Sequence, residues 1–392
     1  MKSSTFLKIF IPLLCMVAVV ITIYHKFPSL FGSRTSVSKF SDITDGSLQN
    51  YYNLAQGLNP RGSTATTSAV FLAVGDIMLS RNVAAAANKA GDVDYPFYKM
   101  SDILKSTDFN FANLESPVSP AKPVVGGSSL IFGAATSSMP ALLDFNFKIL
   151  NLANNHSFDQ GLNGIDATRA ALDSLNILHE GTGDNLDQAW TPAVVASNGI
   201  KICFIGASFS SVNDGGKTTN NYVARIEDVG RLKSAILNLK SVCNFIVVTM
   251  HAGTEYTRTP NAAQTAFAHA AIDDGADMVI GAHPHWVQTV EKYQGKYIFY
   301  SLGNFIFDQA WSQDTKEGLT LKITLSKLGS KNPQTPGAAN LDDLQGSRIP
   351  AKLESIELLP VIIENSQPRP ATADEAKKIL NKINQVDTIL YP

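Results

Sequence analysis

Cysteine is scarce in this sequence, and the few cysteines show no pattern that would organise a fold or a metal site. The chain has three in 392 residues, Cys15, Cys203 and Cys243, which form neither a disulfide framework nor a cysteine-based zinc motif. Cys203 and Cys243 lie within apolar runs that have the character of strands, so we expect them to be buried core thiols. A metal site in this chain would therefore be built from histidine, carboxylate and amide side chains.

An excess of charge of either sign is also absent. The chain carries 32 Lys and Arg residues against 34 Asp and Glu residues, for a net charge of −2. A nucleic-acid-binding protein is expected to show a basic surface, and an acidic tail would appear as a block of like charges. Neither is found here, so we expect no nucleic acid partner.

Long apolar runs are missing too, with one exception at the N-terminus. Residues 9–24 are predominantly apolar, Lys2 and Lys8 precede them, and His25-Lys26 closes the run. A short basic start followed by such a segment is typical of a secretory signal or a signal anchor. Because no small-X-small cleavage triplet follows, we expect an uncleaved transmembrane anchor over residues 1–26, with a cleaved signal as the alternative. The main domain would then lie outside the cytoplasmic membrane.

After this anchor the composition changes twice. Residues 27–68 are rich in Ser, Thr, Gly and Asn, which predicts a flexible linker. From Ala69 onward, strand-like runs alternate with helical patterns, and we expect one domain over 69–392 that includes the C-terminal strands and helix from residue 313. Strands joined both by helices and by hairpin turns such as Asn198-Gly199 predict an α/β fold with mixed sheets.

One strand-like run ends in a pair of histidines. Residues 278–282 are apolar or small, and His283 and His285 follow with one residue between them. Side chains two positions apart share a face of an extended chain, so both imidazoles can point to one side. Imidazole is a common ligand for transition metals, although two histidines in a surface loop would look the same in the sequence. The metal interpretation therefore depends on partners elsewhere in the chain.

Such partners occur at the ends of four other strand-like runs. The five endings together supply carboxylate, amide and imidazole groups: Asp76, Glu115, Asn155 with His156, His251, and His283 with His285. A single ending of this kind is equally well explained by helix capping or a turn, but five in series are not. Carboxylate, amide oxygen and imidazole together suit Mn, Fe or Zn. A shared carboxylate with several imidazoles can also hold two divalent ions about 3.5–4 Å apart.

The order of these motifs resembles the calcineurin-like metallophosphoesterase superfamily, and more closely its capsule-synthesis branch, the CapA or PgsA family associated with poly-γ-glutamate capsules. The matching blocks are Gly75-Asp76, Asn113-Leu114-Glu115, residues 154–159, residues 251–256, residues 281–285 and residues 301–305. The resemblance implies a four-layer αββα sandwich with two mixed sheets. It implies partners as well: an anionic envelope polymer or a phosphoester substrate, the cytoplasmic membrane, and other membrane proteins of capsule synthesis.

The resemblance also implies a role for each donor. Glu115 would bridge two divalent ions, Asp76 and His285 would bind one of them, and Asn155, His251 and His283 would bind the other. His156 would donate a proton to the leaving oxygen or stabilise its charge, and Asp159 would orient His156. Three further residues, Glu255, Tyr256 and Asn304, would face the substrate.

The sequence departs from the superfamily pattern in its first two blocks. The superfamily carries Asp-X-His and then an aspartate, whereas this chain has Asp76-Ile77-Met78 and Glu115. A thioether is a poor ligand for a hard dication, so one metal lacks an imidazole. Two functions follow as alternatives. The first is an extracytoplasmic metal-dependent hydrolase in the synthesis or export of capsule or a related polymer, and the second is a non-catalytic component that holds a polyanion in the same pocket.

Overall fold

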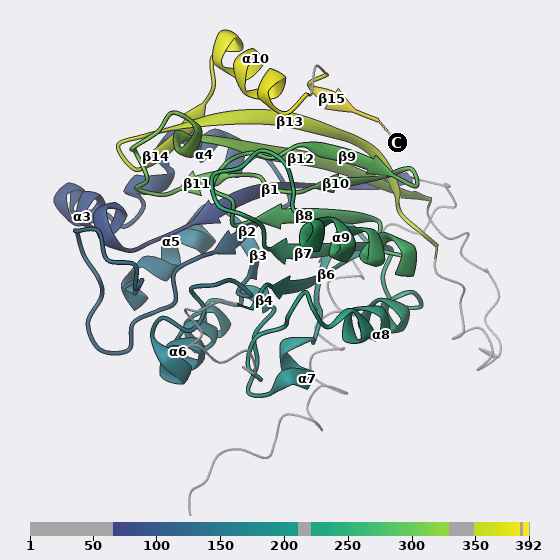
Figure 1. Cartoon of the computed structure of the whole chain (residues 1–392), viewed down its shortest axis with the longest axis horizontal. Coiled ribbons are helices and arrows are strands. Elements are labelled where there is room, and N and C mark those ends of the chain that lie inside the picture. The colour runs from purple at the N-terminus through teal and green to yellow at the C-terminus, as the bar shows by residue number, and fades with distance from the viewer. Residues whose placement is uncertain (1–65, 211–220, 329–348, 385–386, 392) are drawn as a thin grey trace, which may run out of the picture. The chain divides into compact units, whose positions relative to one another are not determined.

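Two mixed β-sheets face each other in the computed structural model of this chain (Figure 1). The structure describes residues 66–210, 221–328, 349–384 and 387–391. The predicted anchor over 1–26 lies outside these ranges, as does nearly all of the predicted linker, and β1 begins at Thr66, shortly before the expected domain boundary. Among the described residues, no helix has both the length and the apolar character that crossing a membrane requires.

The first sheet has nine strands and is parallel in its centre and antiparallel toward one edge. Its order is β14-β13-β12-β1-β2-β3-β4, with β11 paired to β1 and β15 paired to β13. Strands β1 to β4 run parallel, whereas β12, β13 and β14 form an antiparallel ribbon. The bounds are β1 Thr66–Ile77, β2 Phe109–Leu114, β3 Phe147–Asn151, β4 Leu178–Glu180, β11 Asn304–Ile306, β12 Glu317–Leu328, β13 Lys352–Glu364, β14 Gln367–Pro370 and β15 Ile389–Leu390.

The second sheet has six strands in the order β5-β6-β7-β8-β10-β9. Its bounds are β5 Ala193–Ser197, β6 Ile200–Ser208, β7 Phe245–His251, β8 Met278–Ala282, β9 Val290–Tyr293 and β10 Lys296–Phe299. Strands β6, β7, β8 and β10 are parallel, and antiparallel hairpins add the two edge strands β5 and β9. At the first hairpin, Asn198 and Gly199 both have positive φ, as the predicted two-residue turn requires. The prediction of two mixed sheets is confirmed.

Helices cover the outer face of each sheet, as Figure 1 shows for α8 and α9 beside β6 and β7. The helices are α3 Arg81–Ala90, η3 Tyr95–Met100, α4 Ser101–Leu104, η4 Thr136–Ser138, α5 Met139–Asp144, α6 Gly161–Ser174, α7 Leu186–Ala189, α8 Val229–Leu239, α9 Ala262–Asp274, η6 Asp314–Lys316 and α10 Ala373–Lys382. Several helices begin with a side-chain cap. Asn261, for example, forms a capping box with Gln264 at the start of α9.

The apolar core is divided into layers by the alternation of side chains along each strand. On β1, Phe71 points into the cluster between the two sheets, whereas Leu72 joins the cluster beneath the helices on the other face. On β7, Val247 lies between the sheets and Val248 packs beneath α8 and α9. The resulting order of layers is helix, sheet, sheet, helix, so both faces of each sheet are covered. A binding site is therefore expected at the ends of the strands.

The two cysteines of the second sheet form a disulfide, so the expectation of free thiols is wrong. Cys203 lies on β6 and Cys243 shortly precedes β7, with 6.0 Å between their Cα atoms. Both are buried, as expected of core residues. The sequence hid this pair because the two cysteines are 40 residues apart. They meet only because β6 and β7 are neighbouring parallel strands.

Removing this disulfide should destabilise the protein markedly. Closing a 40-residue separation restricts the unfolded chain, which corresponds to about 4 kcal/mol of unfolding free energy on the chain-entropy estimate. We expect the double variant Cys203→Ala, Cys243→Ala to unfold at a lower denaturant concentration than the wild type, by an amount that matches the effect of reductant on the wild type. Reductant should not affect the variant. Equal unfolding midpoints for variant and oxidised wild type would contradict the pairing.

Candidate metal centre

The predicted donors converge at one edge of the two sheets. Asp76 lies near the end of β1, Glu115 follows β2 directly, and Asn155 follows β3. From the second sheet, His251 ends β7, and His283 and His285 follow β8. Parallel strands bring their carboxyl ends to the same edge, and here the carboxyl edges of both sheets adjoin. Each sheet thus supplies half of the donor set.

The donors form two overlapping groups that share Glu115. One group is Glu115, His251 and His283, and the other is Asp76, Glu115 and His285, with the donor atoms of each group within 4.8 Å of one another. Asn155 adjoins the first group, since its Oδ1 lies 2.7 Å from Nε2 of His251. All six residues are buried. This is the arrangement that the predicted division into two ligand sets requires.

Several donor atoms in this cluster are buried without any hydrogen-bond partner. They include both carboxylate oxygens of Glu115 and the Nδ1 atoms of His251 and His283. A buried polar atom that makes no hydrogen bond costs about 1–3 kcal/mol, so native proteins contain few of them. A concentration of such atoms at one point, all of them potential metal ligands, fits a divalent ion.

The pKa shifts of the carboxyl and imidazole groups in this cluster are those expected at a cation-binding site. Burial raises the pKa of Asp76 to about 7. Burial, and then the charge of Asp76, raises the pKa of Glu115 well above its usual value. Burial, and then the neighbouring histidines, holds the pKa of both His251 and His283 well below the usual range, and burial lowers that of His285 to about 3. The imidazoles are therefore neutral, which is their ligand form, and the carboxylates lack a compensating positive charge.

A row of asparagines holds Asp76 in place. Asn113 on β2 donates from Nδ2 to Asp76 Oδ1 at 2.7 Å, and Asn151 on β3 donates to Asn113 Oδ1 at 2.9 Å. Asn154 also donates to Asn113 Oδ1, at 3.3 Å, and to the carbonyl of Leu114 at 2.8 Å. Asn113 and Asn151 lie on the adjacent parallel strands β2 and β3, and Asn154 follows β3, so each amide orients the next. Ligands held by such hydrogen bonds keep their geometry when an ion arrives or leaves.

Asn304, which was predicted to face the substrate, supports a donor instead. It is fully buried, and its Oδ1 lies 2.9 Å from Nδ1 of His285. Its Nδ2 donates to the carbonyl of Thr315 and to Oε1 of Gln309. Because Nδ1–H of His285 is directed to Asn304, Nε2 carries the lone pair. The other two residues predicted to contact substrate lie at the rim, where Glu255 is exposed and Tyr256 is half-buried.

The loop that bears the two histidines has an unusual backbone. His283 and His285 have φ of 100° and 57°, in the left-handed region that side chains other than glycine seldom adopt. Gly281, near the end of β8, lies so close to the chain just after β10 that a Cβ there would be 2.1 Å from the carbonyl oxygen of Tyr300. Such conformations persist where the surrounding structure enforces them, and they are common at functional sites.

His156 lies next to the donor cluster and is firmly oriented. Its Nδ1 is 2.7 Å from Oδ2 of Asp159, and its Nε2 is 3.7 Å from Oε1 of Glu115. Its ring stacks on that of Phe132, with centroids 3.8 Å apart. The same Asp159 oxygen accepts a hydrogen bond from the backbone N–H of Phe132. Asp159 therefore fixes both the imidazole and the ring that covers it.

The sequence did not predict the buried ion pair that lies behind these rings. Arg81 pairs with Asp308, and its guanidinium carbon lies 4.6 Å from the centre of the Phe132 ring. Phe307 packs against His285, with ring centroids 4.9 Å apart. Arg81 and Asp308 are separated by 227 positions, and neither belongs to a periodic pattern. Only the fold brings them together to support the rings around His156 and His285.

Met78, at the position where the sequence resemblance implied a missing histidine ligand, is not part of the cluster. Its side chain is buried in the apolar layer beneath the helices, and its sulfur accepts a hydrogen bond from the N–H of Ser80 at 3.1 Å. Among the described residues, the group formed with Asp76 therefore has a single imidazole, from His285.

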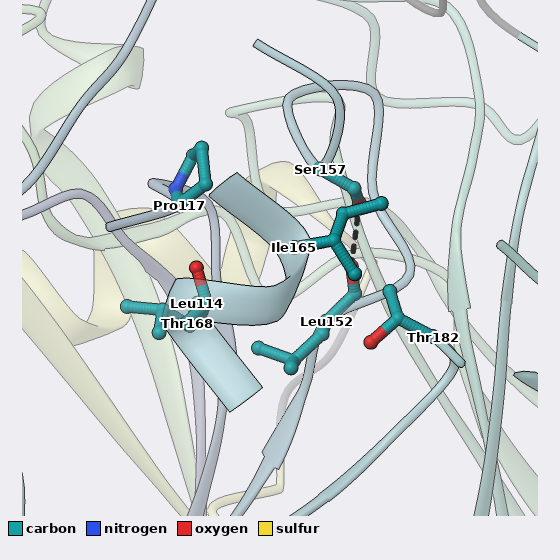
Figure 2. Close-up of a pocket in the computed structure, with 7 residues that line it drawn as sticks. All are labelled: Leu114, Pro117, Leu152, Ser157, Ile165, Thr168 and Thr182. Atoms are coloured by element: carbon teal, nitrogen blue, oxygen red, sulfur yellow. Dashed lines mark hydrogen bonds between the residues drawn. The ribbon is translucent and has the colours of Figure 1, made fainter. Parts of the chain in front are cut away.

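A small cavity in this part of the protein is lined by none of the donors. Figure 2 shows its lining residues, Leu114, Pro117, Leu152, Ser157, Ile165, Thr168 and Thr182. Its volume of about 10 Å³ has room for roughly one water molecule. Ser157 Oγ donates to the carbonyl of Leu152 there, which holds the turn that carries Asn155 and His156. The cavity is a packing feature beneath this turn, with no room for a substrate.

The chain is similar in sequence to a family of bacterial proteins and to two of its relatives. Residues 70–309 match the family described as "Bacterial capsule synthesis protein PGA_cap". The chain is 32% identical over 301 residues to the "PGA biosynthesis protein CapA" of Bacillus subtilis (strain 168), covering 74% of this chain and 76% of that protein. It is 31% identical over 267 residues to the "Capsule biosynthesis protein CapA" of Bacillus anthracis, covering 66% of this chain and 64% of that protein.

A solved structure shows a more distant likeness. The NAD nucleotidase of Haemophilus influenzae has 13% sequence identity and a TM-score of 0.39, over 82% of this chain and 57% of that one.

The match to the capsule synthesis family spans every predicted donor, from Asp76 to His285, as well as Asn304 and Asp308.

Proposed function

Because the chain belongs to the bacterial capsule synthesis protein family PGA_cap, we propose that it takes part in making or exporting an anionic polymer of the cell envelope, and that it does so as a metal-dependent hydrolase. The main evidence for hydrolase activity is the pair of donor groups that share Glu115. Nε2 of His156 lies 3.7 Å from Oε1 of that carboxylate. A purely structural cluster would have no need of an oriented imidazole whose free nitrogen faces the shared ligand.

The donor set would hold one or two divalent ions. Asp76, Glu115 and His285 would bind one ion, and Glu115, Asn155, His251 and His283 the other, with Mn, Fe or Zn as candidates by ligand chemistry. A bound ion would act as a Lewis acid, lowering the pKa of water and neutralising charge on a phosphoryl or carbonyl oxygen.

The protein's own residues would manage the proton and the substrate. With Nδ1–H directed to Asp159, Nε2 of His156 is the nitrogen that faces the site and can carry a proton to the leaving oxygen. As water forms the new bond to phosphorus and the bond to the leaving oxygen breaks, this proton keeps the leaving group neutral. Glu255 and Tyr256 at the rim would contact the flanking part of the substrate.

The disulfide supports a location outside the cytoplasm. Structural disulfides persist in oxidising compartments and are rare in the cytosol of most bacteria, and Cys203–Cys243 is buried within the second sheet. The apolar segment in residues 1–26 would provide the membrane anchor. Protease added to intact spheroplasts should then degrade the domain, whereas a cytosolic marker should survive.

The hydrolase is tested by metal content and by turnover. Protein purified without chelators should contain Mn, Fe or Zn by mass spectrometry and should hydrolyse a chromogenic aryl phosphodiester. Chelation should abolish turnover, and adding back the metal that was found should restore it. Protein that contains no transition metal and gains no activity from any of the three ions would overturn the proposal.

A non-catalytic role in the same process is the second candidate. The single imidazole in the group with Asp76 favours it, because that ion would be held by fewer strong ligands than its neighbour. In that case the site would bind a polyanion without cleaving it. The two functions separate if metal-loaded protein binds an anionic polymer but the variant His156→Ala supports polymer production as well as the wild type does.

A further inference from the structure

The donor set depends on how the two sheets are held against each other. Asp76, Glu115 and Asn155 come from the first sheet, and the three histidines come from the second. A small displacement between the sheets would therefore pull the two halves of the set apart. A large apolar cluster fills the space between the sheets, and apolar packing has no preferred direction. A hydrogen bond between the two sheets near the site, which we call the polar tie, would fix their relative orientation as well.

Glu180 and Thr249 provide such a tie. Glu180 is the last residue of β4 in the first sheet, and its Oε1 accepts a hydrogen bond of 2.6 Å from Oγ1 of Thr249 on β7 of the second sheet. Both residues are 1% exposed. Thr249 precedes His251 by two positions, so both side chains lie on the same face of β7.

On the other side, Glu180 is joined to the row of asparagines that holds Asp76. Strand β4 pairs with β3, where Glu180 lies opposite Asn151. Asn151 donates to Asn113, and Asn113 donates to Asp76. A continuous path of strand pairing and side-chain hydrogen bonds thus connects a donor of the first sheet, through Glu180 and Thr249, to the strand that carries His251.

The space around this carboxyl group is tight and dry. A Cβ added at Gly206 on β6 would lie 1.9 Å from Oε2 of Glu180 and 2.5 Å from Oδ1 of Asn151. Burial raises the pKa of Glu180 to about 8, against smaller opposing effects of the Thr249 and Gly206 hydrogen bonds. The carboxyl group is therefore largely neutral at pH 7.

No charged neighbour accounts for that state among the described strands that pack around Glu180. The titratable groups on these strands are Lys148 on β3, His179 on β4, Lys201 on β6 and His251 on β7. The two lysines are exposed, and His179 pairs with Asp173 at 3.3 Å. Ionising Glu180 would therefore leave a buried negative charge without a countercharge, at the point where the sheets meet.

We propose that Glu180 is a positioning residue for the metal centre, whose hydrogen bond with Thr249 ties the first sheet to β7 and so keeps His251 in place against Asp76, Glu115 and Asn155. This inference rests on the proposed metal site. It also predicts that the site loosens when Glu180 ionises, since the charged form is unstable between the sheets.

The test measures the dissociation constant for Mn²⁺ by calorimetry at pH 7 and pH 8.5. At pH 7, Glu180→Leu and Thr249→Val should each bind Mn²⁺ about tenfold more weakly than the wild type, as for other groups that orient metal ligands. The double variant should be no weaker than either single variant, because both remove the same tie. Glu180→Gln, which keeps the acceptor for Thr249, should bind as the wild type does.

The pH dependence of Mn²⁺ affinity distinguishes a positioning role of Glu180 from a role in packing alone. Between pH 7 and pH 8.5 the wild type should lose more Mn²⁺ affinity than Glu180→Gln, because only the wild type can ionise here. The matched control is Thr320→Val, since Thr320 is also buried on a strand but its Oγ1 makes no hydrogen bond. This control should leave affinity unchanged at both pH values.

Two results would overturn the inference. One is Mn²⁺ affinity in Glu180→Leu and Thr249→Val equal to that of the wild type, and the other is the same pH dependence in the wild type and Glu180→Gln. Both require a wild type that binds Mn²⁺, so they leave the proposed function standing. A wild type that binds no transition metal removes the proposed function and this inference with it.

Discussion

Replacing Glu115 by glutamine is expected to abolish tight metal binding and, at the same time, to stabilise the metal-free protein. Glu115 is the one donor that both groups share, and its two oxygens are buried without hydrogen bonds. Glutamine has nearly the same shape but lacks the charge that both ions need, so affinity should fall by more than about a hundredfold, beyond the usual cost of losing a supporting hydrogen bond.

The gain in stability follows from the cost of burying this carboxylate. Burial, and then Asp76, raises the pKa of Glu115 well above its usual value, so without a metal the folded state disfavours the ionised form that the unfolded chain prefers. This cost is absent below the usual glutamate pKa and grows as the pH rises through neutrality. An amide at this position removes the cost, which we place at about 1–3 kcal/mol.

Both effects can be measured on the same preparations. Metal content by mass spectrometry reports the first, and thermal unfolding in chelator at pH 7.5 reports the second. Glu357→Gln is the matched control, because Glu357 lies on β13 in an exposed pair with Lys322, 3.7 Å away, and should change neither quantity. Retention of wild-type metal content by Glu115→Gln would contradict the assignment of Glu115 as the shared ligand.

Replacing His156 by alanine is expected to remove most of the catalysis while leaving the metal in place. His156 is next to the donors but belongs to neither donor group, and its Nε2 faces Glu115 at 3.7 Å. Loss of a positioned proton donor typically lowers kcat by 10²–10⁴-fold. The loss should be larger for an alkyl phosphodiester than for a nitrophenyl one, because an alkoxide needs the proton and a nitrophenolate leaves without it.

The dependence on leaving group tests the role, and two further variants test its specificity. Asp159→Asn should give a smaller loss in the same direction, since it weakens the hydrogen bond that orients His156. His269→Ala should have no effect, because His269 lies on α9 and pairs with Glu291 away from the site. If His156→Ala loses its metal, or if both esters slow by the same factor, His156 is not the proton donor.

The site is built at the expense of stability. It combines neutral, closely packed imidazoles, two buried carboxyl groups and two histidines in the left-handed region of backbone space. A bound cation would offset these costs, since any ligand that binds only the folded state stabilises it. Metal removal should therefore lower the melting temperature of the wild type and have little effect on Glu115→Gln.

The sequence by itself determined the parts of this protein that depend on short segments. Alternating and continuous apolar runs indicated the strands, and the Asn198-Gly199 turn indicated a hairpin, because these patterns reflect the local geometry of the chain. The polar residues at strand ends indicated a shared edge, because parallel strands place their carboxyl ends together. The ordered blocks then indicated the family, which the match over residues 70–309 shows.

The tertiary structure alone decided which distant residues meet. It paired Cys203 with Cys243 across neighbouring strands, turned Asn304 inward to His285, and placed Arg81 against Asp308 behind the rings of the site. None of these contacts has a local signature, since each depends on the order of strands in a sheet or on the packing of one sheet against the other. The histidine pair after β8 became part of a buried donor cluster for the same reason: its carboxylate partners come from the opposite sheet.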